Sequence, residues 1–304
     1  VIPKFISGDG YIRLCHHLVV PLGYLAVLTV RRESCPNMRS SLVCLVAVIF
    51  LAWTPVHGRP SNRSDVCRPV IKDADKLIQG PIQDQKKAYE LLKSIGAECS
   101  KSVDYFWRMA RASSIYSTIA GAEGNSRLKR ELVDSAITYG KKAVEVAPET
   151  PEAQTWFAVA VGSRSEFQST KDKISDGFTF KKHLDKALEL NPNDPFTRYL
   201  RGTFNYQVSQ LSWMEKRLAA TFFSEPPSGD IKQGLKDLLV ADKVNSITAK
   251  ENSLTLAKTY IALGDLSKAS QAIKKGLSLP TITIDNKLAE KELKSLNKSY
   301  GKSV

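Results

Sequence analysis

The feature that most constrains the fold is a short phrase that recurs along the chain. In its clearest copy, residues 183–197, apolar residues follow one another at three- and four-residue steps, and an Asn-Pro pair then ends the segment. That spacing predicts a helix with one apolar face. Asn193 or Asp194 can cap a second helix there, and Pro195 suits its first turn. The phrase therefore predicts two helices joined by a tight corner.

The corner phrase occurs both before and after this copy. Residues 141–153 repeat the order of small residue, aliphatic residues, proline and acidic restart, and residues 273–285 repeat it with Gly276 in place of the alanine. A phrase that recurs every few tens of residues indicates stacked helical hairpins, because one hairpin cannot bury its own apolar face alone. We therefore expect an all-α solenoid.

The most complete repeat lies near the C-terminus, over residues 254–280. It resembles the tetratricopeptide pattern, in which small residues let two helices approach closely and an aromatic residue fills the space between neighbours. The resemblance implies a tetratricopeptide-like α-solenoid of about four helical hairpins, which we place over residues 73–300. The residues that match the pattern are Leu256, Ala257, Tyr260, Gly264, Asp265, Ala269, Ile273, Gly276 and Pro280.

The first 58 residues do not follow the repeat. An apolar run of 12 residues, 42–53, follows a basic start and ends shortly before the small residue Gly58. A membrane span needs about 20 apolar residues, so we interpret residues 1–58 as a secretory signal peptide cleaved after Gly58, with an uncleaved anchor as the alternative. Met38 is the first methionine, which makes residues 1–37 a candidate upstream stretch. Residues 59–72 would then be a linker.

Two cysteines lie beyond this leader, at the two ends of the first expected hairpin. An even number of cysteines in a chain bound for an oxidising compartment suggests a disulfide between Cys67 and Cys99. In a reducing compartment, two buried free thiols are the expected alternative. The sequons at Asn62 and Asn297 matter only for a secreted chain, in which they would be glycosylation sites.

The charge balance favours acidic partners. The formal net charge is +13 over 304 residues, which suits acidic protein tails, phospholipid head groups or nucleic acid. Nucleic acid is not expected, because no zinc-ligand, glycine-rich or RNA-binding motif accompanies the charge. Of the four histidines, His183 alone lies beyond the leader, so no histidine pair can hold a metal or carry out acid–base chemistry there. We expect neither an enzyme nor a cofactor.

Three longer phrases carry a closer resemblance: FWRMARAS at 106–113, FKKHLDKALELNPNDP at 180–195 and LSWMEKRLAATFFSEPP at 211–227. Together they resemble the regulator of microtubule dynamics family, over about residues 73–296. The resemblance implies a non-enzymatic scaffold that binds microtubules or spindle components, in the cytoplasm and at the spindle cytoskeleton. The leader instead favours a secreted or membrane-anchored repeat protein that binds a protein or phospholipid, and this alternative stays open.

The last of these phrases interrupts the repeat. Its large apolar residues stand at helical spacing and a Pro-Pro pair ends them, which predicts an inserted helix between hairpins. We expect Trp213 and Phe222 in the core, with an apolar binding groove as the alternative.

The repeat register also predicts a ligand groove. In tetratricopeptide arrays the first helix of each pair lines the concave face, so aligning the small residues of these helices identifies the side chains that face it. Two cations beside two tyrosines suit an acidic, partly apolar ligand such as a tubulin tail or a phospholipid. The predicted groove residues are Arg111, Tyr199, Tyr206 and Lys258.

Overall fold

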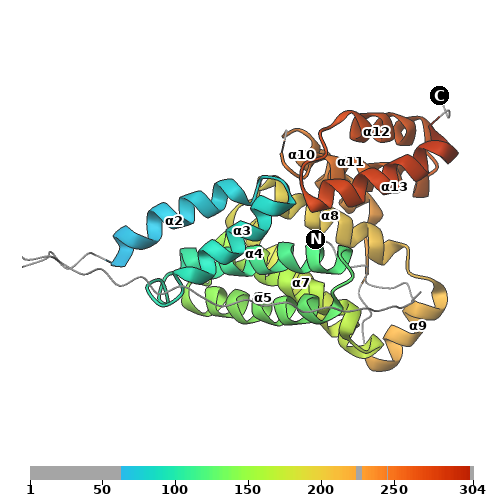
Figure 1. Ribbon diagram of the computed structural model, residues 1–304. Coiled ribbons are helices and arrows are strands. Elements are labelled where there is room, and N and C mark those ends of the chain that lie inside the picture. The colour runs from blue at the N-terminus through green and yellow to red at the C-terminus, as the bar shows by residue number, and fades with distance from the viewer. Residues whose placement is uncertain (1–62, 224–227, 245, 302–304) are drawn as a thin grey trace, which may run out of the picture. The chain divides into compact units, whose positions relative to one another are not determined.

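The structure is a computed structural model that describes residues 63–223, 228–244 and 246–301. These residues belong to one compact unit of the chain. The predicted leader, residues 1–58, and the sequon residue Asn62 lie outside the described residues. Every regular element in the described part is a helix, which agrees with the all-α prediction (Figure 1).

The helices follow one another with short connections. In the described residues they are α2 (Arg63–Leu77), α3 (Ile82–Ser94), α4 (Val103–Ala122), α5 (Ser126–Val146), α6 (Pro151–Ser163), the 3₁₀ turn η1 (Arg164–Phe167), α7 (Thr170–Leu190), α8 (Pro195–Ser209), α9 (Trp213–Phe222), α10 (Ile231–Asp242), α11 (Ala249–Ala262), α12 (Leu266–Ser278) and α13 (Ile284–Tyr300).

These helices pack as successive pairs. The pairs are α2 with α3, α4 with α5, α6 with α7, α8 with α10 and α11 with α12, while α13 packs on α11 and α12. The described residues thus hold five pairs, where the sequence predicts about four. Helix α4 contacts α6 and α8 contacts α11, so the first helices of the pairs form an inner row.

The predicted corner over residues 183–197 has the expected geometry. Helix α7 ends at Leu190, and the Asp194 carboxylate accepts a hydrogen bond from the backbone N–H of Thr197 (2.7 Å) with Pro195 in the first turn of α8. Asn125 and Asp265 cap α5 and α12 in the same way. Each cap satisfies a backbone N–H that would otherwise have no partner, so the corners are fixed locally by the sequence.

Close approach of helices depends on glycine at two crossings. A Cβ added at Gly202 of α8 would lie 2.7 Å from Cγ of Leu238 in α10, and one added at Gly276 of α12 would lie 2.7 Å from Cδ1 of Leu293 in α13. Both leucines are fully buried. The small residues of the repeat therefore set the distance between paired helices.

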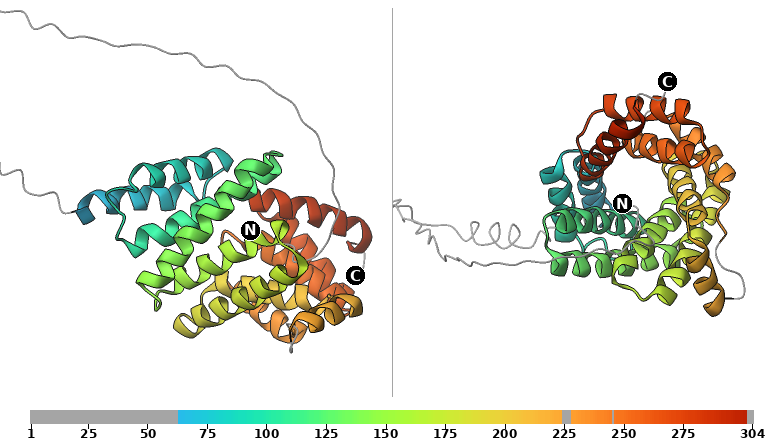
Figure 2. Two further views of the ribbon diagram at one scale, coloured as in Figure 1. Left: turned by 90° about the horizontal axis from the view of Figure 1, so that it is seen from below. Right: turned by 90° about the vertical axis from the view of Figure 1, so that its right-hand side faces the viewer.

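The two ends of the helical unit meet. The backbone N–H of Ile284, at the start of α13, donates to Oε1 of Gln85 in α3 across 199 positions (3.3 Å), and the Gln85 amide donates to the carbonyl of Ile78 (3.2 Å). Ile284 is buried in the same apolar cluster as the first helices. Figure 2 shows the helices following a curve that returns α13 to the N-terminal pair.

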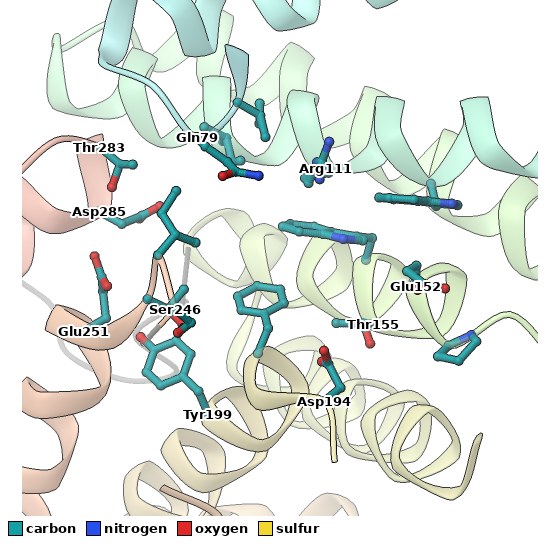
Figure 3. Close-up of a pocket in the computed structure, with 18 of the residues that line it drawn as sticks. Gln79, Arg111, Glu152, Thr155, Asp194, Tyr199, Ser246, Glu251, Thr283 and Asp285 are labelled. Atoms are coloured by element: carbon teal, nitrogen blue, oxygen red, sulfur yellow. The ribbon is translucent and has the colours of Figure 1, made fainter. Parts of the chain in front are cut away.

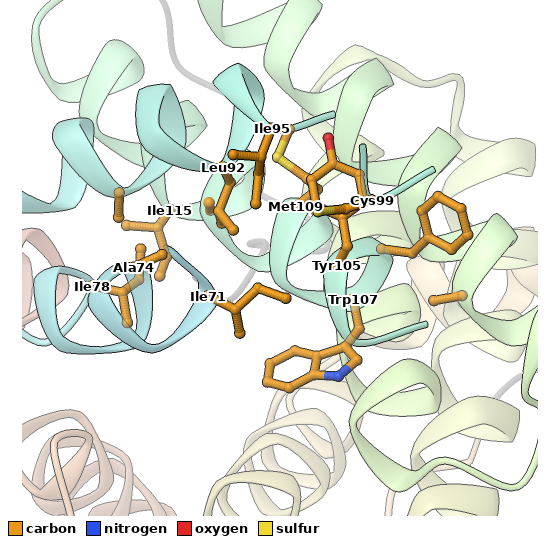
Figure 4. Close-up of a cluster of buried hydrophobic side chains, with 14 of the residues drawn as sticks. Ile71, Ala74, Ile78, Leu92, Ile95, Cys99, Tyr105, Trp107, Met109 and Ile115 are labelled. Carbon is orange, nitrogen blue, oxygen red and sulfur yellow. The ribbon is translucent and has the colours of Figure 1, made fainter. Parts of the chain in front are cut away.

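Helix α2 begins earlier than the sequence predicts. Residues 63–72, expected as part of a linker, are helical, and Cys67 and Ile71 are buried against α3 and α4 (Figure 4). The apolar positions of α2 pack on the next pair, so the helical unit includes this segment.

The inserted helix α9 differs in part from the prediction. Phe222, expected in the core, is 46% exposed, while Ala219 is buried. Helix α9 packs on α7, where the rings of Phe223 and Phe178 lie 5.4 Å apart. The side chain of Trp213 lies outside the described residues.

Candidate functional site

A pocket of about 280 Å³ lies on the inner side of the curve. It is lined by the first helices of successive pairs, α4, α6, α8 and α11, and by the start of α13 (Figure 3). The contact between α13 and the first pairs brings the two ends of the lining together. A concave site of this kind, partly apolar and rimmed by polar groups, is the usual form of a ligand-binding site.

Aromatic rings form one wall of the pocket. Trp156 of α6 and Phe196 of α8 stack with their centroids 5.1 Å apart, and Tyr199 lies 6.5 Å from Phe196. The unit has two apolar clusters, a first centred on α2, α3 and α4 and a second centred on α7, α8 and α11. Trp156 packs against both clusters, which fixes the position of its ring. The wall offers flat apolar surface at little cost in side-chain entropy.

Arg111, one of the predicted groove residues, lines the pocket but is already paired. Its guanidinium forms an ion pair with Asp75 of α2 and lies 5.1 Å from the ring centroid of Trp107. Arg108 also binds Asp75 (2.9 Å), and its guanidinium lies 3.9 Å from the centroid of the same Trp107 ring. Burial lowers the pKa of Arg111. Because Asp75 neutralises it, Arg111 adds little free positive charge to the pocket.

The pocket is instead lined by carboxylates. Among the described residues, the lining includes four acids, Glu152, Asp194, Glu251 and Asp285, against the single basic residue Arg111. Over residues 63–301 the chain carries 37 Lys and Arg against 29 Asp and Glu, a net charge of +8. The positive charge of this unit is therefore outside the pocket, and the pocket itself is negative.

Glu251 is the most buried of these acids, with 6% of its surface exposed. Its Oε1 accepts a hydrogen bond from the Asn286 amide (2.7 Å), while its Oε2 is buried without a hydrogen-bond partner among the described residues. Burial raises the pKa of Glu251 to about 7, and the nearby carboxylate of Asp285 adds to the rise. Burial, followed by the charges of Glu251 and Asp285, also raises the pKa of Tyr199.

We expect Glu251→Gln to stabilise the protein more at high pH than at low pH. A carboxyl group whose pKa is higher in the folded than in the unfolded chain binds more protons when folded, so stability falls as pH rises from about 4.5 to about 7. Glutamine keeps the oxygen that accepts from Asn286 and removes the charge. The gain in unfolding free energy should be on the order of 2 kcal/mol at pH 8 and near zero at pH 4.5. Urea unfolding at both pH values measures it, and a gain that does not change with pH would contradict it.

The other two predicted groove residues do not reach this pocket. Lys258 of α11 forms an ion pair with Glu292 of α13, and the pKa of the half-buried Tyr206 is raised first by burial and then by the charge of Glu292. The register thus brings Arg111 and Tyr199 to the pocket, and α13 lies over the region of Lys258 and Tyr206. The pair of free cations that would suit an acidic ligand is not formed.

The acidic lining was not predicted, although the sequence carries a signal for it. Glu152 and Asp194 stand beside the prolines that start α6 and α8. Helix starts favour acidic residues through capping and the helix dipole, and the starts of these inner helices reach the pocket. Asp285 occupies the first turn of α13, whose capping box is formed by Thr283 and Asn286.

The structure also places the predicted modification sites. Cys67 and Cys99 are joined by a disulfide, with their Cα atoms 6.0 Å apart, between α2 and the turn after α3 (Figure 4). The sequon residue Asn297 is exposed in the last turn of α13. Whether the cysteines are oxidised and Asn297 is glycosylated in the native source stays a prediction.

His183 takes a structural position. Its Nδ1 lies 2.5 Å from Oε1 of Gln154, and its ring packs on Phe157 at 4.7 Å. Burial, followed by the charge of Lys182, lowers its pKa.

Among the described residues no group of three or more His, Cys, Asp or Glu side chains is arranged to hold a metal ion. No helix in the same part of the chain combines the length and apolar character that crossing a membrane requires.

Comparison with known sequences agrees with the family resemblance found in the sequence. The family model described as Regulator of microtubule dynamics protein 1-3 matches residues 70–301. The chain is 34% identical to Regulator of microtubule dynamics protein 2 of Bos taurus, covering 76% of this chain and 55% of that protein. It is 33% identical to Regulator of microtubule dynamics protein 3 of Mus musculus, covering 79% and 50%. The chain therefore spans about half the length of these curated relatives.

Comparison with solved structures supports the fold. A thermophilic TPR protein of Thermus thermophilus matches with a TM-score of 0.51 and 16% sequence identity, over 75% of this chain and 98% of that chain. At this identity the match concerns the fold alone, and it confirms the predicted tetratricopeptide-like solenoid.

Proposed function

The chain belongs to the regulator of microtubule dynamics family, and on that premise we propose that it is a non-enzymatic scaffold that binds microtubules through its basic outer surface. Its relatives are named for regulating microtubule dynamics. A scaffold of stacked helices offers a long surface for a protein partner without any catalytic group. The proposed location is therefore the microtubule cytoskeleton.

The distribution of charge is the observation that carries this proposal. The helical unit has a net charge of +8 although the charged residues that line its pocket are mostly acids, so the positive charge lies outside the pocket. On α12, Lys268, Lys274 and Lys275 are all exposed. Two of them have ion-pair partners at the surface, Asp265 and Asp242. Such exposed pairs contribute little and can exchange for an acidic partner.

We expect the triple variant Lys268→Glu, Lys274→Glu, Lys275→Glu to bind microtubules at least tenfold more weakly in co-sedimentation. Reversing three surface charges weakens attraction to an acidic polymer, and added salt should weaken the wild-type interaction in the same direction because screening acts over about 8 Å at physiological ionic strength. Helical circular dichroism and the melting temperature check that the variant is folded.

A matched control separates the outer surface from the pocket. Glu251→Gln changes the charge of the pocket and leaves α12 intact, so its co-sedimentation should equal that of the wild type. If the folded triple variant still binds like the wild type, α12 is not the binding surface. If wild-type protein does not co-sediment at low salt, the microtubule proposal itself fails.

The alternative, a phospholipid or other acidic ligand in the groove, has less support. Its basis is a pair of free cations beside two tyrosines. Arg111 and Lys258 are both neutralised, by Asp75 and Glu292 respectively. A phosphate or carboxylate ligand in the pocket would face the four acidic lining residues, and like charges at close range repel.

A further inference from the structure

The pocket is concave and negatively charged, whereas the proposed microtubule-binding surface on α12 is basic. This difference indicates that the pocket takes a second kind of ligand. We propose that the pocket binds an extended peptide segment through a lysine or arginine side chain, with the cationic head group at Glu251 and Asp285 and the side-chain stem along Trp156 and Phe196. This site is distinct from the proposed microtubule-binding surface, and its test does not depend on that surface.

The first argument is the unused hydrogen-bonding capacity of Glu251. The residue is 6% exposed, and within the described part of the chain its Oε2 is buried without a partner. Asn286 holds the other oxygen, which fixes the orientation of the carboxylate. A buried carboxylate oxygen without a partner is costly. An ammonium or guanidinium group supplies both the donors and the opposite charge that this oxygen lacks.

The second argument is that two carboxylates share this side of the pocket. Figure 3 shows Glu251 and Asp285 on the same side, and the charge of Asp285 contributes to the electrostatic environment of Glu251. Glu152 and Asp194 lie on the opposite side of the view. Arg111, the one basic side chain among the described lining residues, is paired with Asp75. A cation bound at Glu251 would therefore lower the repulsion between this carboxylate and that of Asp285.

The third argument is the aromatic wall. The stacked rings of Trp156 and Phe196 line the same pocket as the four acids. Long basic side chains bury their alkyl stems on such surfaces while the head group reaches a polar partner, and a cation near a ring face gains further attraction. An acidic peptide side chain could use the wall but would be repelled by the carboxylates.

The fourth argument favours a peptide over a free amine. Gln79 and Asn191 line the pocket, and within the described residues neither side-chain amide has a hydrogen-bond partner. An amide side chain can both donate to and accept from a peptide backbone. Both side chains are exposed on the pocket wall, so they are available to hold the main chain of an extended peptide whose basic side chain reaches Glu251.

The experiment compares two peptide pools on the immobilised protein at its full length. One pool holds acetylated hexapeptides with a central lysine or arginine among random uncharged residues, and the other holds the same peptides with central glutamate. Retained peptides are quantified by mass spectrometry. We expect the wild type to enrich the basic pool at least fivefold over the acidic pool, and free butylammonium to compete only at much higher concentration.

Two variants locate the site. Glu251→Gln should abolish the enrichment, and it should do so in a folded protein because it removes a buried charge. Glu131→Gln, at an exposed position of α5 outside the pocket, should retain it. Equal retention of both pools, retention that survives in Glu251→Gln, or saturable binding of short-chain phosphatidylcholine without any retained basic peptide would each overturn the proposal.

Discussion

Replacement of Asp237 by alanine is expected to lower the free energy of unfolding by about 3–5 kcal/mol. Asp237 of α10 is fully buried, and its carboxylate accepts hydrogen bonds from Arg198 (2.5 Å) and Arg201 (2.8 Å) of α8. Each arginine has only about a fifth of its side chain exposed. Removing the carboxylate leaves two mostly buried cations beside each other, and their repulsion adds to their lost hydrogen bonds.

Two further variants test whether the expected loss of stability comes from the buried charges around Asp237. Asp242→Ala breaks the surface pair with Lys275, in which the side chains are 25% and 45% exposed, and should cost less than about 1 kcal/mol. Adding Arg198→Met and Arg201→Met to Asp237→Ala should recover much of the loss, because these two buried charges are then removed as well. Urea unfolding followed by circular dichroism measures all three. A loss for Asp237→Ala no greater than that for Asp242→Ala would contradict the reasoning.

The sequence predicts the hairpins because their determinants are local. The cap of Asp194 on Thr197 and the proline beside it lie within one turn, so the corner can be inferred from adjacent residues. Gly202 and Gly276 are likewise visible as small residues in the repeat register, and each faces a large side chain of a neighbouring helix. Local rules of capping and close packing thus account for the pairs.

Features that depend on the whole curve could not be predicted in this way. The contact of Ile284 with Gln85 joins residues 199 positions apart. It depends on the small rotation between successive pairs, summed along the array, which no single repeat specifies. The early start of α2 was not predicted for a related reason. Its apolar positions can be recognised as core positions only when the contacts with α3 and α4 are known.

In the candidate site, too, local features could be predicted from the sequence and contacts between distant residues could not. The register brings Arg111 and Tyr199 to the pocket, but their surroundings come from elsewhere in the chain. Asp75, which neutralises Arg111, lies 36 positions earlier on another helix. Lys258 meets its partner Glu292 on a helix that the repeat pattern does not include. Which cations remain free therefore depends on tertiary contacts, and the repeat pattern does not contain that information.

The resulting separation of charge lets the two proposals be tested independently. Ligands of opposite sign would be attracted to different faces, because the pocket is acidic while the unit as a whole is basic. At physiological salt, charges separated by more than about 8 Å are largely screened from each other. A variant of the pocket should therefore change peptide binding without changing microtubule binding, and a variant of α12 should do the reverse.

The oxidised protein is expected to lose about 4 kcal/mol of unfolding free energy when Cys67 and Cys99 are both replaced by alanine. The disulfide closes a loop of 32 positions, and the entropy that such a loop removes from the unfolded chain corresponds to about 4 kcal/mol. Both cysteines are buried in the first apolar cluster, so alanine also leaves some packing space unfilled.

Reduction provides the decisive comparison for this disulfide. A thiol reductant should destabilise the wild type by a similar amount and leave the double-alanine variant unchanged, because only the covalent link differs. Peptide mapping of protein from its native source, without reduction, should recover the Cys67 and Cys99 peptides linked if the chain enters an oxidising compartment. Recovery of both as free thiols would show that α2 is held there by apolar packing alone.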